Sequence, residues 1–206
     1  MHEDFKYTNS DPSSMASLSL EKFKVLQSEG SQLIDSRPTN DFASSFIPNS
    51  VNASLNGSYE YMASCIFHKE KHLVVICDAG REGESILRLE SEGFKDISTF
   101  NFDLWNGNMR SITRVKAKEA HNFVDIMKDV SNAEDWEVLH VKGVKSFPLV
   151  GIITDYTSIN ENDVLYCGNG HKSMAAASFL KNKGINVKDI IGGLSAMLVD
   201  APELEI

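Results

Sequence analysis

The stretch Asp163-Val-Leu-Tyr-Cys167-Gly-Asn-Gly170-His-Lys-Ser173 decides the fold. A short apolar segment ends at Cys167, two glycines interrupt it, and the chain then enters a helical pattern with apolar side chains at 174–176, 179 and 180. Gly184 follows where a helix C-cap is expected, and a second short apolar segment occupies 187–191. Strand, tight loop, helix and strand in this order predict a βαβ crossover on a parallel sheet.

The same arrangement occurs earlier in the chain. Leu73-Val-Val-Ile-Cys77 leads into Asp-Ala-Gly80-Arg81, then into a helical pattern that ends at Gly93, and then into an apolar segment at 97–102. The two closing glycines lie 16 and 17 residues after their cysteines. The chain is therefore an imperfect repeat, and each copy predicts a small α/β domain with a parallel sheet flanked by helices.

The two copies differ in the spacing of their landmarks. Leu33-Ile-Asp35-Ser-Arg37 opens the first copy. Val138-Leu-His140-Val-Lys142 has the same shape, with His140 and Lys142 at the places of Asp35 and Arg37. Asp35 precedes Cys77 by 42 positions, whereas His140 precedes Cys167 by 27. We therefore expect the second copy to lack 15 residues between these landmarks.

These landmarks predict an N-terminal arm at 1–17, a first domain at 18–112 and a shortened second domain at 113–206. An amphipathic pattern at 110–132 predicts a linker and an opening helix. The deletion should leave apolar side chains of the second domain in water unless the first domain or this helix covers them, so we expect a tight interdomain interface. Its candidate residues are Phe147, Leu149, Val150, Ile152 and Ile153.

The composition excludes several classes of protein. Twenty Lys and Arg against 29 Asp and Glu give a net charge of −9, so the chain lacks the basic surface that nucleic acids or anionic membranes need. No apolar run approaches the roughly 20 residues of a membrane span, and the polar N-terminus lacks the features of a signal peptide. Three cysteines are too few for a disulfide scaffold, so we expect a cytoplasmic protein. We also expect neither a metal nor a cofactor.

Cys167 is the stronger candidate nucleophile. A cysteine between a strand and a glycine-containing loop lies among backbone N–H groups, at the positive end of the following helix dipole. Such surroundings lower the pKa of a thiol and hold its thiolate. The loop has no acidic residue, and Lys172 together with a partly protonated His171 adds positive charge. The candidate binding residues are Gly168, Asn169, Gly170, His171, Lys172 and Ser173.

The loop after Cys77 is a weaker second candidate. Its Gly80 and Arg81 fit the pattern, but three carboxylates lie close by. At an effective dielectric constant of about 20, a like charge at ~4 Å costs about 4 kcal/mol, which opposes a thiolate and repels an anionic substrate. Arg81 offsets one of these carboxylates at most. They belong to Asp78, Glu82 and Glu84.

Each candidate also has a plain structural interpretation. Cys167 and Cys77 are alternatively buried packing thiols, and for Cys77 this is the favoured interpretation. Cys65 lies in an apolar helical pattern and is expected in the core. Asp35 and Arg37 are expected to form a structural ion pair at a strand end, with His140 and Lys142 in the equivalent place of the second copy.

The landmarks of both copies resemble the rhodanese family of sulfurtransferases. A typical rhodanese domain opens with a Leu-Ile-Asp-Val-Arg-like strand and continues through Gly-His-Ile-Pro-Gly-Ala. It carries Cys-x-x-Gly-x-Arg-Ser before its active-site helix and closes with Gly-Gly-x-x-x-Trp. The second copy reads Cys167-Gly-Asn-Gly170-His-Lys172-Ser173 and then Gly192-Gly193-Leu-Ser-Ala-Met197. It departs from the family at Lys172 and Met197, which replace arginine and tryptophan.

The first copy matches the opening strand and the loop after Cys77, with Phe46 in place of the motif histidine and Asn49 in place of the glycine after proline. Its Gly-Arg-Glu-Gly-Glu stretch at 80–84 also looks like the first module of paired rhodanese domains fused to metallo-β-lactamase-fold persulfide dioxygenases. The His-x-His-x-Asp-His metal signature of such a dioxygenase is absent. The resemblance covers nearly the whole chain, from about residue 18 to residue 198.

The resemblance implies a sulfurtransferase. It would move sulfane sulfur from thiosulfate or a persulfide or polysulfide to a thiol or cyanide, through a persulfide on Cys167. Its partners would be a small-molecule sulfur donor and a thiol acceptor, with neither nucleic acid nor membrane. The alternative is a catalytically degenerate tandem module that binds persulfidated or anionic partners, or docks a persulfide dioxygenase. The missing arginine and tryptophan leave this alternative open.

The two cysteine loops predict different outcomes for matched substitutions. Cys167→Ser should abolish sulfur transfer, whereas Cys77→Ser should leave most of it, because the charges around the second loop favour a thiolate and those around the first oppose it. Turnover of thiosulfate in the two variants is the measurement. Equal losses would contradict the assignment of Cys167.

Overall fold

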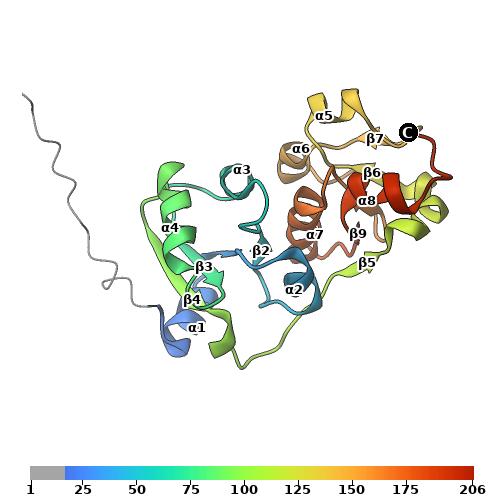
Figure 1. Ribbon diagram of the computed structural model, residues 1–206. Coiled ribbons are helices and arrows are strands. Elements are labelled where there is room, and N and C mark those ends of the chain that lie inside the picture. Colours follow the sequence, from blue (N-terminus) through green and yellow to red (C-terminus); the bar gives the residue numbers. More distant parts are fainter. Residues whose placement is uncertain (1–16) are drawn as a thin grey trace, which may run out of the picture.

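Two parallel sheets, each flanked by helices, make up the structure, a computed structural model that describes residues 17–206 (Figure 1). This arrangement confirms the predicted α/β class and its two domains. The predicted N-terminal arm, residues 1–17, lies outside the described residues except for Ser17.

The first sheet has the strand order β2-β1-β3-β4. Its central strand β3 carries five consecutive buried residues, as expected for a β-branched strand covered on both faces. The strands are β1 (Gln32–Asp35), β2 (Val51–Asn52), β3 (Leu73–Cys77) and β4 (Ile97–Asn101). The helices are α1 (Leu20–Ser28), α2 (Thr39–Ser44), α3 (Tyr59–Ile66), α4 (Glu82–Ser91) and the 3₁₀ helix η2 (Phe102–Leu104).

The second sheet has the strand order β5-β9-β8-β6-β7. The helices that follow the cysteines end at Ser91 and Asn182, each two residues before a predicted glycine. These glycines, Gly93 and Gly184, have φ angles of 89° and 86°, as expected just after a helix C-cap. The strands are β5 (Thr113–Val115), β6 (Met127–Asp129), β7 (Lys145–Ser146), β8 (Val164–Tyr166) and β9 (Lys188–Ile190). The helices are η3 (Ala117–Ile126, 3₁₀), α5 (Ala133–Val138), α6 (Leu149–Thr154), α7 (His171–Asn182) and α8 (Gly193–Asp200).

The opening strand of the second domain is not the one predicted at 138–142. β6 takes that place, since Asp129 pairs with Tyr166 just as Asp35 pairs with Ile76, in each case one residue before the cysteine. Asp129 precedes Cys167 by 38 positions, so the second copy is four residues shorter than the first between these landmarks, not 15. The sequence pattern does not indicate a strand at β6, because its Met-Lys-Asp sequence is short and mostly polar.

Residues 138–142 end α5 and enter the loop before β7. Gly143 and Asn49 both have positive φ, 82° and 71°, and both lie two residues before the edge strand of their sheet. His140 is therefore the counterpart of Phe46, not of Asp35. The predicted linker and opening helix at 110–132 are only partly confirmed, because this stretch contains the 3₁₀ helix η3 between the strands β5 and β6.

The predicted interdomain interface is present, although its predicted cause, a 15-residue deletion, is not. α3 packs against α6, and one hydrophobic core joins the two domains (Figure 1). Leu149 and Ile152 are buried in this core beside Tyr59 and Met62. Phe147 and Ile153 are partly buried against it, and Val150 is 52 % exposed.

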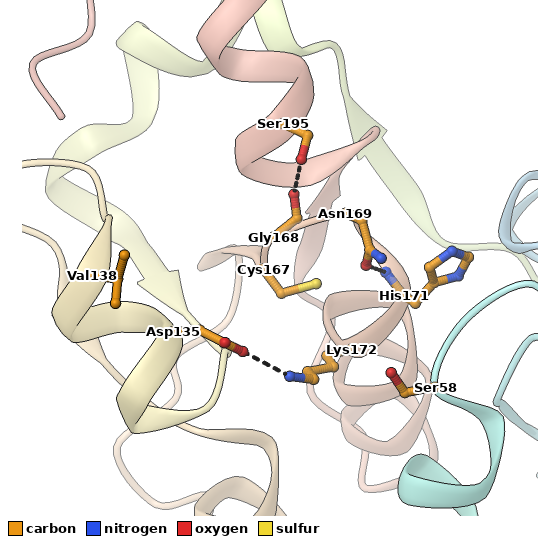
Figure 2. Close-up of a pocket in the computed structure, with 9 residues that line it drawn as sticks. All are labelled: Ser58, Asp135, Val138, Cys167, Gly168, Asn169, His171, Lys172 and Ser195. Carbon is orange, nitrogen blue, oxygen red and sulfur yellow. Dashed lines mark hydrogen bonds and ion pairs between the residues drawn. The ribbon is translucent and has the colours of Figure 1, made fainter.

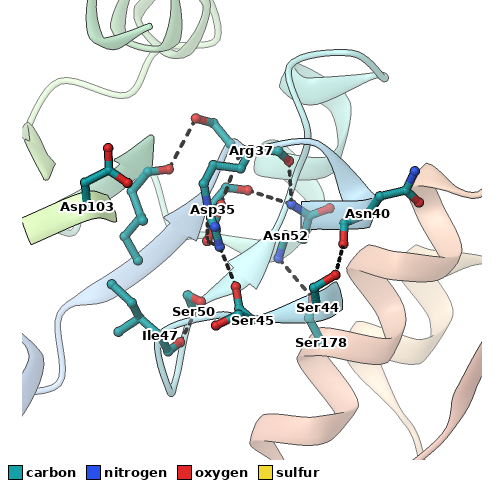
Figure 3. Close-up of polar contacts among 12 residues, drawn as sticks. Asp35, Arg37, Asn40, Ser44, Ser45, Ile47, Ser50, Asn52, Asp103 and Ser178 are labelled. Atoms are coloured by element: carbon teal, nitrogen blue, oxygen red, sulfur yellow. Dashed lines mark hydrogen bonds and ion pairs between the residues drawn. The ribbon is translucent and has the colours of Figure 1, made fainter. Parts of the chain in front are cut away.

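Polar contacts fasten the helix α7 to the edge strand β2 of the first domain (Figure 3). The Asn52 backbone N–H donates to Ser178 Oγ at 3.0 Å, and Asn182 Nδ2 donates to the Ser50 carbonyl at 3.0 Å. β2 is itself held by Asn52 Nδ2, which donates to the carbonyls of Asp35 and Arg37, both at 3.0 Å. The helix that follows Cys167 is therefore anchored on the first domain.

Asp35 and Arg37 form the structural ion pair that the sequence predicts. Arg37 Nη2 lies 2.8 Å from Asp35 Oδ2, and both side chains are buried. Arg37 Nη2 also donates to the Ser45 carbonyl at 2.9 Å, which fixes the chain after α2 (Figure 3). Removing either partner of such a buried pair destabilises the fold, because the other charge is left buried and uncompensated.

The shared core predicts different effects for two aliphatic side chains of α6. Ile152→Ala should lower the free energy of unfolding by about 2–5 kcal/mol, because it empties a buried site between the domains. Val150→Ala, at an exposed position of the same helix, should change it by about 0.5 kcal/mol or less. Chemical denaturation measures both, and equal effects would contradict the buried interface.

Candidate functional site

The loop after Cys167 is held in shape by Gly192 and Gly193 at the start of α8. The Leu194 N–H donates to the Cys167 carbonyl at 2.8 Å, and the Ser195 N–H donates to the Gly168 carbonyl at 2.9 Å. A Cβ on Gly193 would lie 2.1 Å from the Cys167 carbonyl oxygen, so only glycine permits this approach. Gly170, with φ 87°, turns the chain into α7. The loop curls around the sulfur, and the Gly170 N–H donates to Cys167 Sγ at 3.2 Å.

A cavity of about 490 Å³ opens at this loop. The predicted loop residues Cys167, Gly168, Asn169, His171 and Lys172 all line it, and the other walls come from elsewhere in the chain (Figure 2). Gly170 and Ser173 lie behind this lining, in contact with the sulfur. The remaining lining residues are Ser58 of the first domain, Asp135 and Val138 of α5, and Ser195 of α8.

Burial raises the pKa of the Cys167 thiol, which is the opposite of the predicted direction. The residue is 1 % exposed, so its thiolate loses hydration, and the nearby Asp189 carboxylate raises the pKa further. The backbone N–H groups of Ser173, Asn169 and Gly170 lower the pKa, as predicted, but their effect is smaller than that of burial. The resting side chain is therefore a thiol at neutral pH.

A buried carboxylate lies behind the cysteine. Ser173 Oγ donates to Asp189 Oδ1, and Arg114 holds Oδ2 through Nε at 2.7 Å and Nη2 at 2.6 Å. Burial raises the pKa of Asp189 to about 6 against the lowering effect of Arg114. The Ser173 hydroxyl already donates its hydrogen bond to Asp189. Its oxygen therefore accepts a hydrogen bond from the Cys167 thiol, with Sγ and Oγ 3.8 Å apart. Sequence reasoning missed Asp189, whose one signal is a charged residue within the closing strand.

Lys172 does not face the cavity as a free cation. Its Nζ lies 3.2 Å from Asp135 Oδ2 (Figure 2). The same nitrogen lies 5.4 Å from the centre of the Tyr61 ring. Tyr61 is fixed in turn by a hydrogen bond of 3.0 Å from its hydroxyl to Asn132 Oδ1. Sequence reasoning found no acid in the loop and missed Asp135, because α5 brings it to the site from 32 positions before Cys167.

His171 is a neutral wall of the site, which corrects the prediction that it is partly protonated. Burial and the positive charge of Arg114 lower its pKa. Its ring packs on the first domain, where a Cβ on Gly57 would lie 2.6 Å from His171 Cγ. The predicted loop is therefore cationic at Lys172 alone, and the first domain contacts both side chains, His171 at Gly57 and Lys172 through the Tyr61 ring.

The structure does not assemble a comparable site at Cys77. The Cys77 side chain is fully buried, and burial followed by the charges of Glu82, Asp35 and Asp78 raises its pKa to about 12. Arg81 lowers the pKa slightly but is paired with Glu84 at 2.8 Å. The cavity beside Asp78 and Arg81 holds about 10 Å³, the space of one water at most. Gly80 turns this loop with φ 85°.

Cys65 is half-buried against the hydrophobic core, which agrees with the packing role expected for it. Within residues 17–206, no group of three His, Cys, Asp or Glu side chains is placed to hold a metal ion. Over the same residues, no helix combines the length and the apolar composition needed to cross a bilayer.

The burial of the two cysteines predicts their reactivity toward iodoacetamide, which reacts with thiolates. Cys167 should be modified slowly at pH 7 and faster as the pH rises, because its raised pKa keeps it protonated. Cys77 should react more slowly still, since its pKa is about 12. Peptide mass spectrometry measures both rates, with the unfolded chain as control. Modification of native Cys167 at pH 7 as fast as in the unfolded chain would contradict the raised pKa.

Comparison with known proteins agrees with this geometry. The family model for the rhodanese-like domain matches residues 19–102 and again residues 113–199. Over 88 residues the chain is 31 % identical to the thiosulfate sulfurtransferase GlpE of Pseudomonas savastanoi pv. phaseolicola, a match that covers 41 % of this chain and 81 % of that protein.

Two solved structures are also similar. SSP1007 from Staphylococcus saprophyticus matches with a TM-score of 0.40 and 19 % identity, over 46 % of this chain and 100 % of that one. A thiosulfate sulfurtransferase from Pseudomonas aeruginosa matches with a TM-score of 0.36 and 16 % identity, over 88 % of this chain and 46 % of that one. On the strength of the two family-model matches, the chain belongs to the rhodanese-like domain family and contains two such domains.

Proposed function

We propose that the chain is a sulfurtransferase that carries sulfane sulfur on Cys167. The observation that supports this most is the position of Cys167 Sγ. It lies within an amide-lined loop, 3.2 Å from the Gly170 nitrogen, at a cavity of about 490 Å³. The second support is the thiosulfate sulfurtransferase to which the chain is 31 % identical.

The reaction needs two displacements at sulfur. The Cys167 thiol first releases its proton to solvent. The resulting thiolate attacks the outer sulfur of thiosulfate, the S–S bond of thiosulfate breaks, and sulfite leaves with the electron pair. Cys167 then carries a persulfide. A thiolate or cyanide attacks the terminal sulfur of this persulfide, and the Cys167 thiolate leaves with the electron pair of the second S–S bond. The sulfane sulfur changes carrier, and no external oxidant is required.

The residues of the loop have distinct parts in this scheme. The N–H groups of Asn169, Gly170 and Ser173 surround Cys167 and would stabilise the anionic terminal sulfur of the persulfide. Lys172 would attract the anionic donor as a point charge, without the bidentate fork of an arginine. Because all three cysteines are free thiols, the chain also suits the reducing cytoplasm where we propose that it works.

The first domain would act as a non-catalytic partner. Its Cys77 is enclosed and has a pKa of about 12, which disfavours a thiolate. Its own contribution lies at the other site, where Ser58 lines the cavity, Gly57 supports His171 and the Tyr61 ring lies beside Lys172. In this proposal the first domain shapes the cavity of the second.

The alternative is a degenerate tandem module that binds persulfidated or anionic partners, or docks a persulfide dioxygenase, without turnover. Two observations favour it: the Cys167 pKa is raised, and Lys172 is paired with Asp135. The raised pKa leaves little Cys167 thiolate to attack a donor, and the Asp135 carboxylate offsets the charge of Lys172 that would attract an anionic donor.

Intact-mass measurement separates the two proposals. After incubation with thiosulfate, a sulfurtransferase should gain the mass of one sulfur atom on Cys167, and added cyanide should remove it. The Cys77→Ser variant should gain the same mass, and the Cys167→Ser variant should not. A chain that stays unmodified after incubation with thiosulfate, with polysulfide and with a low-molecular-weight persulfide would contradict the proposed function and favour a binding module.

A further inference from the structure

The cavity at Cys167 carries one positive and one negative charge. Of its nine described lining residues, Lys172 and Asp135 are charged, and the lowered pKa of His171 keeps that side chain neutral. The two charged groups face each other at 3.2 Å from α7 and α5 (Figure 2). The lining is therefore neutral overall, which suits a ligand that bears both signs of charge.

Thiosulfate matches this lining poorly. It is a small dianion, so one end of it would be attracted by Lys172 while the Asp135 carboxylate repels it. Its few atoms would also fill only a small part of about 490 Å³, a volume within the range of pockets that enclose organic ligands. Both the charge and the size of the cavity favour a larger donor than thiosulfate.

We propose that the preferred sulfur donor is a low-molecular-weight amino-thiol persulfide, a molecule that carries an ammonium group and a carboxylate beside its sulfane sulfur. This proposal rests on the proposed sulfurtransferase function. The donor carboxylate binds Lys172 and its ammonium group binds Asp135, so one ion pair of the free protein is exchanged for two. Val138, which lines the same cavity and is 83 % exposed, offers an apolar surface to the carbon chain of the donor.

The positions of the two charges favour this exchange. Lys172 is 15 % exposed and lies beside the Tyr61 ring, so its ammonium group stays near the cavity when the pair opens. Asp135 is 60 % exposed, so separating it from Lys172 breaks a solvent-screened contact, which is a weak one. The lysine is fixed and the aspartate is free to adjust to a ligand.

The sulfur transfer from such a donor is balanced. The Cys167 thiol releases its proton to solvent, the resulting thiolate attacks the outer sulfur of R–S–SH, and the bond between the two donor sulfurs breaks. The R–S group leaves with the electron pair and takes the proton of the outer sulfur, so R–SH departs. Cys167 retains the persulfide anion, and the negative charge stays at the amide-lined loop.

The experiment compares sulfur loading of Cys167 in the full chain from cysteine persulfide, from the persulfide of 2-mercaptoethanol and from thiosulfate. The variant is Asp135→Asn, and the matched control is Glu137→Gln, which removes the same charge from an exposed position of α5 that does not line the cavity. Intact-mass measurement at short times gives the loading rates.

The native chain should load faster from cysteine persulfide than from the uncharged persulfide. Asp135→Asn should slow loading from cysteine persulfide about tenfold, as expected for the loss of one charge-assisted hydrogen bond. The same variant should speed loading from thiosulfate, because a repelling carboxylate is removed. Glu137→Gln should leave all three rates unchanged.

Two results would overturn the inference. If Asp135→Asn changes the rates with cysteine persulfide and thiosulfate in the same direction, or if the native chain does not distinguish the two persulfides, Asp135 does not select the donor although sulfur transfer still occurs. If no donor loads sulfur on Cys167, the proposed function fails and the inference fails with it.

Discussion

The contact on which the site depends is the hydrogen bond from the Leu194 N–H to the Cys167 carbonyl, made beside Gly193. It joins the end of β8 to the start of α8 at a separation that no side chain at position 193 would allow. With the main chain fixed there, Gly170 turns the loop so that its N–H reaches the sulfur at 3.2 Å. Main-chain packing therefore determines the shape of the amide-lined loop, independently of most of its side chains.

The two copies show how one fold places equivalent cysteines in different surroundings. Cys77 and Cys167 occupy equivalent places at the ends of central strands. At Cys77, burial and acidic neighbours disfavour a thiolate. The adjacent cavity of about 10 Å³ is too small for a substrate. At Cys167, the open cavity is completed by Ser58 of the first domain. The first domain therefore contributes a lining residue to the cavity of the second domain.

Local patterns in the sequence were sufficient to predict the two cysteine loops, their helices and the α/β class. Strand–glycine–helix signals lie within about 20 adjacent residues, and Gly93 and Gly184 follow the helix ends with positive φ, as expected. The opening strand of the second domain was misplaced because β6 has three residues and one apolar side chain. The pattern at 138–142 looked more like a strand, but tertiary pairing selected β6.

Local patterns could not predict the two acidic residues at the Cys167 site, Asp189, which raises the pKa of Cys167, and Asp135, which pairs with Lys172. Asp135 and Asp189 come from elements 32 positions before and 22 positions after the cysteine, and only the folded sheet and α5 bring them to it. Burial has the same origin, since the loop motif gives no sign that the sulfur is 1 % exposed. The motif identifies the cysteine, whereas long-range packing sets its protonation state. A buried thiol that ionises reluctantly is also protected from adventitious oxidants, which react with exposed thiolates.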